Sequence, residues 1–535
     1  MKNLIISFTI LFGFGLSAFA QEKSNKEVKG DKYFFTYSYD KAILSYKHSK
    51  QLTFPGQRRL AESYFIMGQN AQAEETYLKL VNASNGVIPE DYFNYAMVLK
   101  NSGKYAESTI WLDKFQSQAP TDLRAISYSN NKLQFPDYLT NDVDCKIIKQ
   151  SINTDAQDFG TSYYNDKIVY ASSNAKPKMI KRTYNWNGQP FLNLYIADVE
   201  DGQLKNPEFF NKDLNDKMHE GPASFSNGGT KMAFTRNNEK DKSKDKIVEL
   251  QIFLSEFKEG KWSDAIPFVY NNTEYSVGHP FLTLDGKTMY FASDMPGGFG
   301  GTDLYKSNLS ENGEWLTPVN MGILINTEGD EMFPFFEEDQ QILSFASNGH
   351  FGMGGLDIFN CASNGADWGL INNPGSPINT QYDDYAQIFN SKTNKGYMSS
   401  NRTDGSGNDD IYAFEIAPKA IVNKIIIGIA KDTQGKAIPG TFVSLFDEQD
   451  TLLAYILADD LGAYQFSVVT DKNFELTGTK EYYLDGSIVT SSYGVEDTIV
   501  ANLTLLQDEV EEEVVIVPED LVVDKDLAKL VKLKP

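Results

Sequence analysis

Three Gly-rich loops near the middle of the chain have residue types and a spacing that could bind a ligand. They run SDMPGGFGGTD from Ser293, SNGHFGMGGLD from Ser347 and SNRTDGSGNDD from Ser400, so a Ser and an Asp lie ten residues apart in each. Carboxylate and carbonyl oxygens are the ligands that hard cations prefer. The third loop is richest in them, and its candidate metal ligands are Asp404, Asn408 and Asp410.

The same loops also have a structural interpretation. Glycines such as Gly297 and Gly354 permit positive φ in a tight turn, and an Asp beside a turn accepts backbone N–H groups. The third loop does not complete the Asp-x-Asn-x-Asn-Gly…Glu pattern of a calcium loop. We therefore predict that the Asp residues close turns, and we keep Asp404, Asn408 and Asp410 as secondary candidates for a metal site.

The other polar patterns do not form a catalytic constellation. His219, His279 and His350 lack the HExxH spacing of a zinc site. The sequence has no Gly-x-Ser-x-Gly elbow, no phosphate-binding loop and no Cys/His nucleophile pair. We therefore predict no catalytic residue, no cofactor and no enzymatic activity.

One catalytic alternative remains open. Acidic residues recur at 155–158, 328–331 and 383–384, and paired carboxylates that converge on a central channel could hydrolyse a glycosidic bond. Their recurrence in several repeats favours a role in the scaffold over a single active site.

The elements that must position these residues form a repeat. The three Ser residues lie 54 and 53 positions apart, and a period of about 40–55 residues with several short strands is typical of a β-propeller. Five units can be cut at Asn153, Asn215, Asn272, Asn326 and Asn379. The fifth unit lacks an outer strand, and residues 144–152 would supply it and leave no open edge. We predict a five-bladed propeller over residues 140–418, which resembles the WD40-like (PD40) and TolB-like propellers.

The chain before the propeller is predicted to be helical. Small and bulky residues recur there with the spacing that two closely crossing helices need, at Ala61, Tyr64, Gly68, Ala73 and Tyr77 and again at Ala96, Leu99, Gly103, Ser108 and Leu112. This pattern over residues 21–130 resembles tetratricopeptide repeats, each a pair of antiparallel helices. A generic helical hairpin domain is the alternative.

The chain after the propeller is predicted to be a small β-sandwich over residues 420–507. Apolar residues alternate there between Gly-containing turns. The order of Gly428, Pro439, Gly440, Val443, Asp459, Gly462, Tyr464 and Phe466 resembles the carboxypeptidase-regulatory-like domain. An acidic linker follows over residues 508–535, with nine acidic residues against one Lys between positions 508 and 526.

Length, charge and the N-terminus bound the class of protein. At 535 residues the chain is too long for one core, and its formal charge of −24 argues against a nucleic-acid partner. A basic Lys2, an apolar run and an Ala18-Phe19-Ala20 site predict a signal peptide over residues 1–20. We therefore expect export to the periplasm. Cys145 and Cys361 could pair there or remain buried thiols.

The order of these parts resembles the PorE-like, OmpA-family periplasmic proteins of Bacteroidota that are associated with the type IX secretion system. The resemblance implies partners among secretion or outer-membrane components, and an OmpA-like domain that binds peptidoglycan after the linker. Residues 527–535 resemble the lead-in to that domain, but its diaminopimelate-binding Asp and Arg have no counterpart in this sequence.

The function predicted from the sequence is a non-catalytic periplasmic scaffold or adaptor that links envelope components, with peptidoglycan anchoring if an OmpA-like domain follows. The alternative is a carbohydrate or peptidoglycan sensor that stacks sugars on Tyr and Asn side chains at the top face of the propeller. Neither prediction includes a nucleic-acid partner.

Overall fold

The computed structural model describes residues 22–140, 145–174, 190–211, 219–238, 242–363, 365, 368–417, 424–469, 472–493 and 497–508. The predicted signal peptide (residues 1–20), the acidic linker beyond residue 508 and the Asn215 boundary lie outside these residues. The chain divides into two compact units between residues 419 and 420, and each unit is described by itself.

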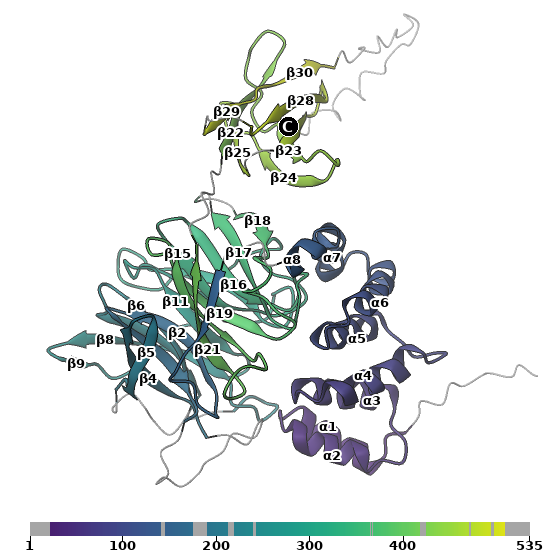
Figure 1. Ribbon diagram of the computed structural model, residues 1–535, viewed down its shortest axis with the longest axis vertical. Coiled ribbons are helices and arrows are strands. Elements are labelled where there is room, and N and C mark those ends of the chain that lie inside the picture. The colour runs from purple at the N-terminus through teal and green to yellow at the C-terminus, as the bar shows by residue number, and fades with distance from the viewer. Residues whose placement is uncertain are drawn as a thin grey trace, which may run out of the picture. The chain divides into compact units, whose positions relative to one another are not determined.

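The first unit begins with helices packed as antiparallel pairs (Figure 1). They are α1 (Asn25–Phe34), α2 (Tyr39–Lys47), α3 (Phe54–Ile66), α4 (Asn70–Val81), α5 (Pro89–Asn101), α6 (Tyr105–Gln118), α7 (Leu123–Asn131) and α8 (Phe135–Leu139). Small residues lie where paired helices cross: Ala61, Ala73 and Ala96 are fully buried. A Cβ at Gly30 would lie 2.4 Å from the Tyr46 ring, so that ring can pack against the α1 backbone only because the residue is Gly.

A β-propeller follows the helices, which confirms the prediction of helices followed by a propeller. Its inner strands are β2 (Asp158–Tyr164), β6 (Glu220–Ser226), β11 (Val277–Leu282), β15 (Glu331–Glu337) and β19 (Asp384–Asn390). The second strands are β3 (Lys167–Ser172), β7 (Lys231–Asn237), β12 (Thr288–Ser293), β16 (Ile342–Ser347) and β20 (Lys395–Ser400). The third strands are β4 (Asn193–Glu200), β8 (Leu250–Lys258), β13 (Asp303–Asn308), β17 (Asp357–Ser363) and β21 (Asp410–Ile416).

The outer strands complete five sheets, which we number as blades in the order of their inner strands. They are β5 (Gln203–Phe209), β10 (Ile266–Pro267), β14 (Val319–Asn320), β18 (Trp368–Asn372) and, in the fifth blade, β1 (Cys145–Lys149); β9 (Lys261–Trp262) also pairs with β8. The strand β1 pairs antiparallel with β21, with Cys145 opposite Ile416. The strand that precedes the first blade therefore completes the last blade.

An Asn side chain fixes each of four connections between blades. Asn153, Asn271, Asn326 and Asn379 each accept a backbone N–H with the amide oxygen and donate to the carbonyl of the same residue, which is Ile411, Ile252, Leu304 and Ile358 respectively. In each case that residue lies on the third strand of a blade. The amide oxygen thus pairs a buried N–H, as buried polar groups require. The amide N–H joins a carbonyl that, for Ile411, Ile252 and Leu304, also accepts a backbone N–H.

Every inner strand contains a β-bulge, because its register against the second strand shifts after the first pairs. Four of the bulges hold a residue with positive φ: Gly160, His279, Phe333 and Ala386. Positive φ is uncommon for residues other than Gly. A bulge changes the direction of the side chain that it carries. These four residues therefore depart from the regular alternation of their strands, and we call them the bulge layer.

The second unit consists of two sheets that enclose one core. One sheet contains β22 (Lys424–Asp432), β25 (Ala463–Val468), β27 (Tyr483–Leu484), β29 (Thr498–Val500) and β30 (Leu503–Gln507), and the other contains β23 (Phe442–Phe446), β24 (Leu452–Leu457), β26 (Asn473–Thr479) and β28 (Gly486–Ser491). Ile426, Val443 and Leu505 are fully buried between them. A Cβ at Gly428 would lie 1.8 Å from the Ala501 carbonyl oxygen and 2.5 Å from the Tyr464 ring, which explains Gly at this position.

Two further sequence questions are answered by the structure. Cys145 and Cys361 are not joined by a disulfide, and burial raises the pKa of the Cys361 thiol to about 12. In the part of the chain that the structure describes, no helix has the length and apolar character needed to cross a membrane.

Candidate functional site

The Ser-to-Asp loops connect the second and third strands of the last three blades. Each Ser pairs directly with its Asp across the two strands: Ser293 with Asp303, Ser347 with Asp357, and Ser400 with Asp410. Each Asp carboxylate accepts two backbone N–H groups of the loop at 2.7–3.1 Å, from Phe299 and Gly300, Met353 and Gly354, and Ser406 and Gly407. The three carboxylates therefore close their turns.

The secondary metal candidates of the third loop have different surroundings. Asp404 is exposed, and its carboxylate accepts the Tyr412 hydroxyl at 2.9 Å. The backbone N–H of Asn408 donates to the Ala156 carbonyl at 3.2 Å, while Asp410 is fully buried. Among the described residues, no group of three or more His, Cys, Asp or Glu side chains is arranged to hold a metal ion.

The recurring acidic residues hold the connections that lead into the inner strands. Asp158, Glu331 and Asp384 are fully buried at the first position of their strands. Each accepts both the backbone N–H and the hydroxyl of a Thr four residues earlier, at 2.6–2.8 Å; the Thr residues are Thr154, Thr327 and Thr380. Burial raises the pKa of Glu331 to about 7. The same contact in three blades gives these carboxylates a common structural role.

The three His residues of the propeller are separated from one another and lie in different blades. Burial lowers the pKa of each imidazole to about 4, so all three are neutral at pH 7. His219 accepts the backbone N–H of Leu192 through Nδ1, and Nε2 of His350 lies 2.9 Å from the Ile325 carbonyl oxygen. His279 instead stacks on the Phe333 ring, with centroids 3.8 Å apart.

The loop of the fourth blade differs from its two counterparts because it docks the helices. Phe351 is only 7% exposed and packs among residues of α5 to α8, with ring centroids 5.1 Å from Tyr128 and 5.2 Å from Phe135. The equivalent positions of the neighbouring loops are occupied by Gly297 and Asp404. The Ser and Asp that all three loops share therefore mark the strands of the blades, whereas Phe351, which the other two loops lack, marks the contact with the helices.

A buried Lys completes this helix–propeller contact. Lys100 is 3% exposed; its ammonium lies 4.4 Å from the centre of the Phe351 ring and donates to the Gly352 carbonyl at 2.8 Å. Burial lowers the pKa of Lys100 to about 8, and burial raises the pKa of the nearby Asp357 to about 7. The charge is retained in a buried place because an aromatic face and a carbonyl oxygen replace its water.

Further hydrogen bonds connect the helices to loops at the same end of the propeller, among them that of the Ser376 N–H with the Tyr138 carbonyl of α8 at 2.8 Å. The Leu123 backbone N–H at the start of α7 donates to the Glu328 carboxylate at 2.8 Å. The Phe351 backbone N–H donates to the Ser127 hydroxyl at 2.9 Å, and the Asn101 side chain donates to the Gln381 carbonyl at 3.0 Å. We call these contacts together with Phe351 and Lys100 the helix–propeller lock. It covers part of the top face on which the sensor alternative places sugars.

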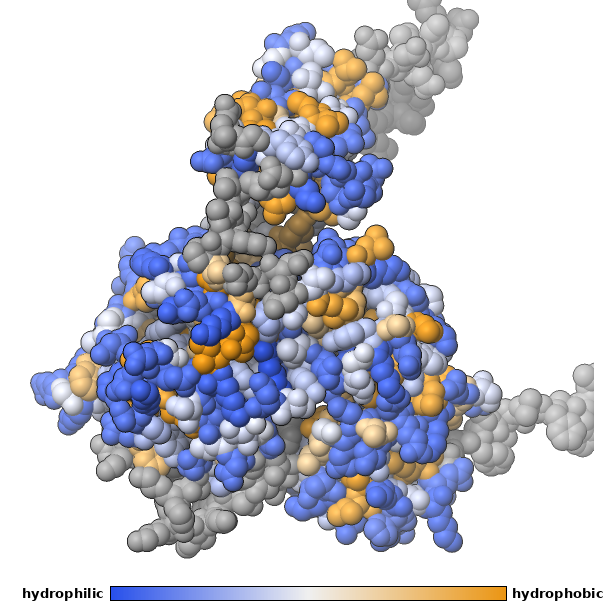
Figure 2. Space-filling view, in the orientation of Figure 1, coloured by the Kyte–Doolittle hydropathy of each residue, from blue (hydrophilic) through white to orange (hydrophobic). Residues whose placement is uncertain are grey.

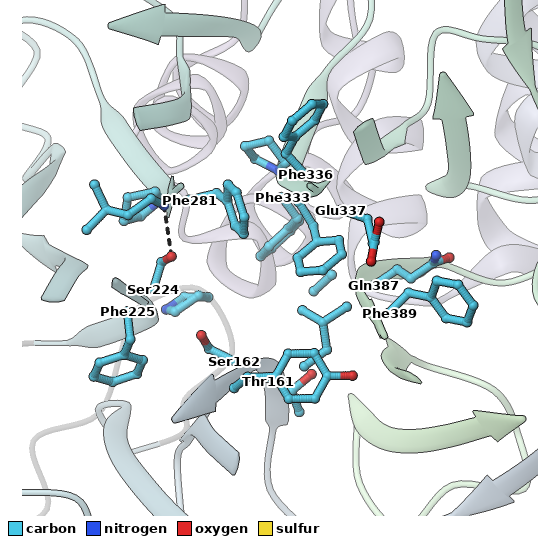
Figure 3. Close-up of a pocket in the computed structure, with 18 of the residues that line it drawn as sticks. Thr161, Ser162, Ser224, Phe225, Phe281, Phe333, Phe336, Glu337, Gln387 and Phe389 are labelled. Atoms are coloured by element: carbon cyan, nitrogen blue, oxygen red, sulfur yellow. Dashed lines mark hydrogen bonds between the residues drawn. The ribbon is translucent and has the colours of Figure 1, made fainter. Parts of the chain in front are cut away.

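The propeller also encloses a cavity of about 280 Å³ on its axis, lined by all five inner strands (Figure 3). Its inner end is formed by His279 and Phe333 of the bulge layer. The Phe333 ring lies 4.9 Å from that of Tyr385 and 6.4 Å from that of Phe159, measured between centroids. The cavity runs from these rings toward the turns after the inner strands, where Lys392 lines it. The lock lies at the opposite ends of these strands. We call this space the central cavity.

The wall of the central cavity divides into an aromatic and a polar part. Phe281 and Phe335 of blades 3 and 4 stand edge to face, with centroids 5.2 Å apart. Thr161, Ser224 and Gln387 come from blades 1, 2 and 5. Figure 3 shows Phe225 and Phe336 pointing away from the middle of the cavity, and both belong to the cores between blades.

The sequence analysis did not predict the central cavity. Of its lining residues it considered only His279, and only to note that this residue lacks the spacing of a zinc site. The sequence did contain a signal for it, which is a Pro-Phe pair common to two repeats. His279-Pro280-Phe281 and Phe333-Pro334-Phe335 occupy equivalent positions of neighbouring inner strands. Pro cannot donate to a strand ladder, so a Pro at this point of two inner strands is compatible with the bulges.

No protein family and no curated protein matches the chain by sequence. Solved structures with similar folds include a putative TolB from Agrobacterium tumefaciens, at 13% identity and TM-score 0.31, covering 51% of this chain and 98% of that one. A xylan β-1,4-xylosidase from Bacillus halodurans is 10% identical at TM-score 0.35 and covers 65% of this chain and 90% of that one.

A third similar structure is a 3-chlorocatechol 1,2-dioxygenase from Rhodococcus opacus, at 10% identity and TM-score 0.13. The match covers 16% of this chain and spans only 60% of that enzyme. Similarities at these values concern the fold alone and identify no binding or catalytic residue in this chain.

The comparisons correct one sequence-based prediction. The exclusion of an enzyme is wrong as a general statement, because several proteins of similar fold are glycosidases: a xylosidase, an arabinase, two arabinofuranosidases and a galactanase. The physical reason is that a propeller fold does not itself determine function.

Proposed function

We propose that this protein is an exported adaptor of the bacterial cell envelope, related in domain order to the PorE-like, OmpA-family periplasmic proteins. In this proposal the helices are tetratricopeptide-like repeats, the propeller is of the five-bladed TolB-like or PD40-like kind, and the second unit is a carboxypeptidase-regulatory-like sandwich. Anchoring to peptidoglycan would come from an OmpA-like domain after the acidic linker.

The observation that carries the proposal is a row of exposed apolar residues at the repeat spacing. Leu44 on α2, Leu78 on α4 and Ile110 on α6 are 57%, 42% and 57% exposed, and they lie 34 and 32 residues apart. Single exposed apolar residues are ordinary, but one on the second helix of each successive pair produces a repeated surface. Repeat arrays use such extended surfaces to bind proteins. Figure 2 shows hydrophobic residues distributed over the helical part.

The helix–propeller lock supports the same proposal. Phe351 packs against α7 and α8, Glu328 accepts the N–H at the start of α7, and Lys100 of α5 donates to the Gly352 carbonyl. The helices therefore contact the propeller through three of their number. A partner bound along the row would then be held in a fixed position relative to the propeller, which is what an adaptor requires.

The proposal is tested by cross-linking in cells followed by capture of the exported protein. We expect envelope proteins to be recovered with the wild type and lost with the double variant Leu78→Glu, Ile110→Glu. Leu133→Glu is the matched control, because Leu133 is 80% exposed but lies outside the row. Recovery of no envelope protein with the wild type, or equal recovery with the double variant, would overturn the proposal.

A further inference from the structure

We propose that the central cavity binds one uncharged sugar ring, with its C–H face against the phenyl rings of blades 3 and 4 and its hydroxyls toward blades 1, 2 and 5. This inference does not depend on the proposed adaptor function, which uses the helices.

The size and closure of the cavity suit a small ligand. Its volume of about 280 Å³ is just below the roughly 300–1,000 Å³ of typical ligand pockets. The stacked rings of His279 and Phe333 form its inner end, with centroids 3.8 Å apart and planes 13° apart. A ligand that enters from the turn side therefore stops at an aromatic floor and does not pass along the axis.

The wall of the central cavity has an apolar part and a polar part, which suits a ligand that has both an apolar face and hydroxyl groups. Phe281 and Phe335 present an apolar wall, against which the C–H groups of a pyranose ring can pack. Thr161, Ser162 and Gln387 line the cavity on the other blades with hydroxyls and a primary amide, and the Gln387 amide also donates to the Ser344 hydroxyl at 3.5 Å. A few polar groups set in an apolar pocket are the usual way to orient a ligand.

An unsatisfied hydroxyl indicates that the polar wall is incomplete without a partner. Thr161 lines the cavity and is 5% exposed, yet its Oγ1 has no hydrogen-bond partner among the described residues. Nδ1 of His279 at the floor is also buried without a partner in that set. Leaving a buried polar group unpaired costs about 1–3 kcal/mol. Because Oγ1 itself is buried, a ligand hydroxyl reaches it once the Thr161 side chain rotates toward the cavity, and that contact removes a penalty that the free protein carries.

The charges around the cavity disfavour an anionic ligand. Glu337 lines it at 8% exposure, and its carboxylate already accepts the backbone N–H of Gln340 at 2.6 Å. Lys392 at the turn side is paired with Asp339 at 2.7 Å. The cavity thus offers no unpaired cation from its lining residues. An uncharged ring with hydroxyls is favoured over a carboxylated or phosphorylated one.

The test is ligand-observed NMR and calorimetry on the mature full chain with glucose, N-acetylglucosamine, xylose and arabinose as separate probes. Glucuronate and choline are the charged probes. We expect at least one neutral sugar to bind, and Thr161→Val to weaken it about 3–10-fold, the value of one neutral hydrogen bond. Ser226→Ala is the matched control: Ser226 also has a buried hydroxyl without a described partner, but it lies outside the cavity lining.

Both variants remove an unpaired buried hydroxyl, so neither should lower the melting temperature. If Thr161→Val does not fold, Gln387→Leu takes its place, with the same expected loss of affinity. The proposal is overturned if no neutral sugar binds, if choline or glucuronate binds in place of the sugars, or if the cavity variant binds as tightly as Ser226→Ala.

Discussion

The substitution Phe351→Ala tests whether one loop residue holds the helices to the propeller. Phe351 is 93% buried, because its exposed fraction is 7%, and most of its ring contacts are with the helices. Truncation of a buried Phe to Ala costs about 3–5 kcal/mol in cores. It also removes the aromatic face beneath the Lys100 ammonium, which leaves that buried charge with the Gly352 carbonyl and the nearby Asp357 carboxyl. We therefore expect the stability of the α5–α8 segment to fall by at least about 3 kcal/mol.

Hydrogen exchange followed by mass spectrometry measures this effect segment by segment. Amides of α7 and α8 should exchange faster by a factor of at least about 100, since 1.4 kcal/mol corresponds to a factor of ten, while amides of blades 1 and 2 should be unchanged. Phe299→Ala is the matched control, because Phe299 lies in the corresponding loop of blade 3 but is 43% exposed. Its effect should stay within about 0.5 kcal/mol. Unchanged exchange in α7 and α8 of the Phe351 variant would refute the reasoning.

Three further predictions concern stability. Burial raises the pKa of Glu62 from 4.5 to about 7. Between these two values the folded state holds a proton on Glu62 that the unfolded state has lost, so the protein loses stability as pH rises from 4.5 to 7. Glu62→Gln should therefore raise the melting temperature at pH 8 and leave it unchanged at pH 4. Asn326→Ala leaves the N–H of Leu304 unpaired, while the Leu304 carbonyl still accepts the Met321 N–H, and should cost about 1–3 kcal/mol in urea denaturation. Gly428→Ala forces a methyl group to within 1.8 Å of the Ala501 carbonyl oxygen and should destabilise the second unit by about 1–3 kcal/mol or more, seen as a lower melting transition of that unit.

Each of these has a result that would contradict it. If the melting temperature changed between pH 4 and pH 8 by the same amount in Glu62→Gln as in the wild type, the Glu62 carboxyl would titrate with its ordinary pKa. Asn312→Ala, at an exposed Asn of the same blade, is the control for the Asn326 variant, and equal denaturation midpoints would remove the role assigned to the amide. A second unit that melts normally in Gly428→Ala would show that its backbone can shift.

The repeat could be predicted from the sequence because the spacing between the Ser and the Asp of each loop determines where two strands end and how long the turn between them is. Ser293 and Asp303 are paired residues at the ends of β12 and β13, so their distance along the chain is the length of the loop. The Thr that precedes each acidic residue by four positions, as Thr327 precedes Glu331, likewise sets a local contact. Such contacts lie within a few residues of each other, which is why a pattern in the sequence records them.

The lock and the central cavity could not be read in the same way. Phe351 is an apolar residue in a Gly-rich loop, and its partners on α5 to α8 lie more than 200 residues earlier, with no pattern to pair them. His279 and Phe333 reach the axis because their backbone φ is positive at a bulge. Alternation of apolar residues, which predicts strands, assumes a regular pleat and so misplaces residues at a bulge.

The way in which β1 completes the fifth blade has a mechanical consequence. Cys145, the first residue of β1, lies opposite Ile416, the last residue of β21, so the chain enters and leaves the ring at the same end of one antiparallel ladder. Tension between the helices and the second unit would therefore peel this ladder one hydrogen-bonded pair at a time and would not load all its pairs together. The contacts of Phe351 and Lys100 run parallel to this path and would carry part of the load. Under force, the contacts between the helices and the propeller would break first. The pairing of β1 with β21 would then separate, before any other blade is disturbed.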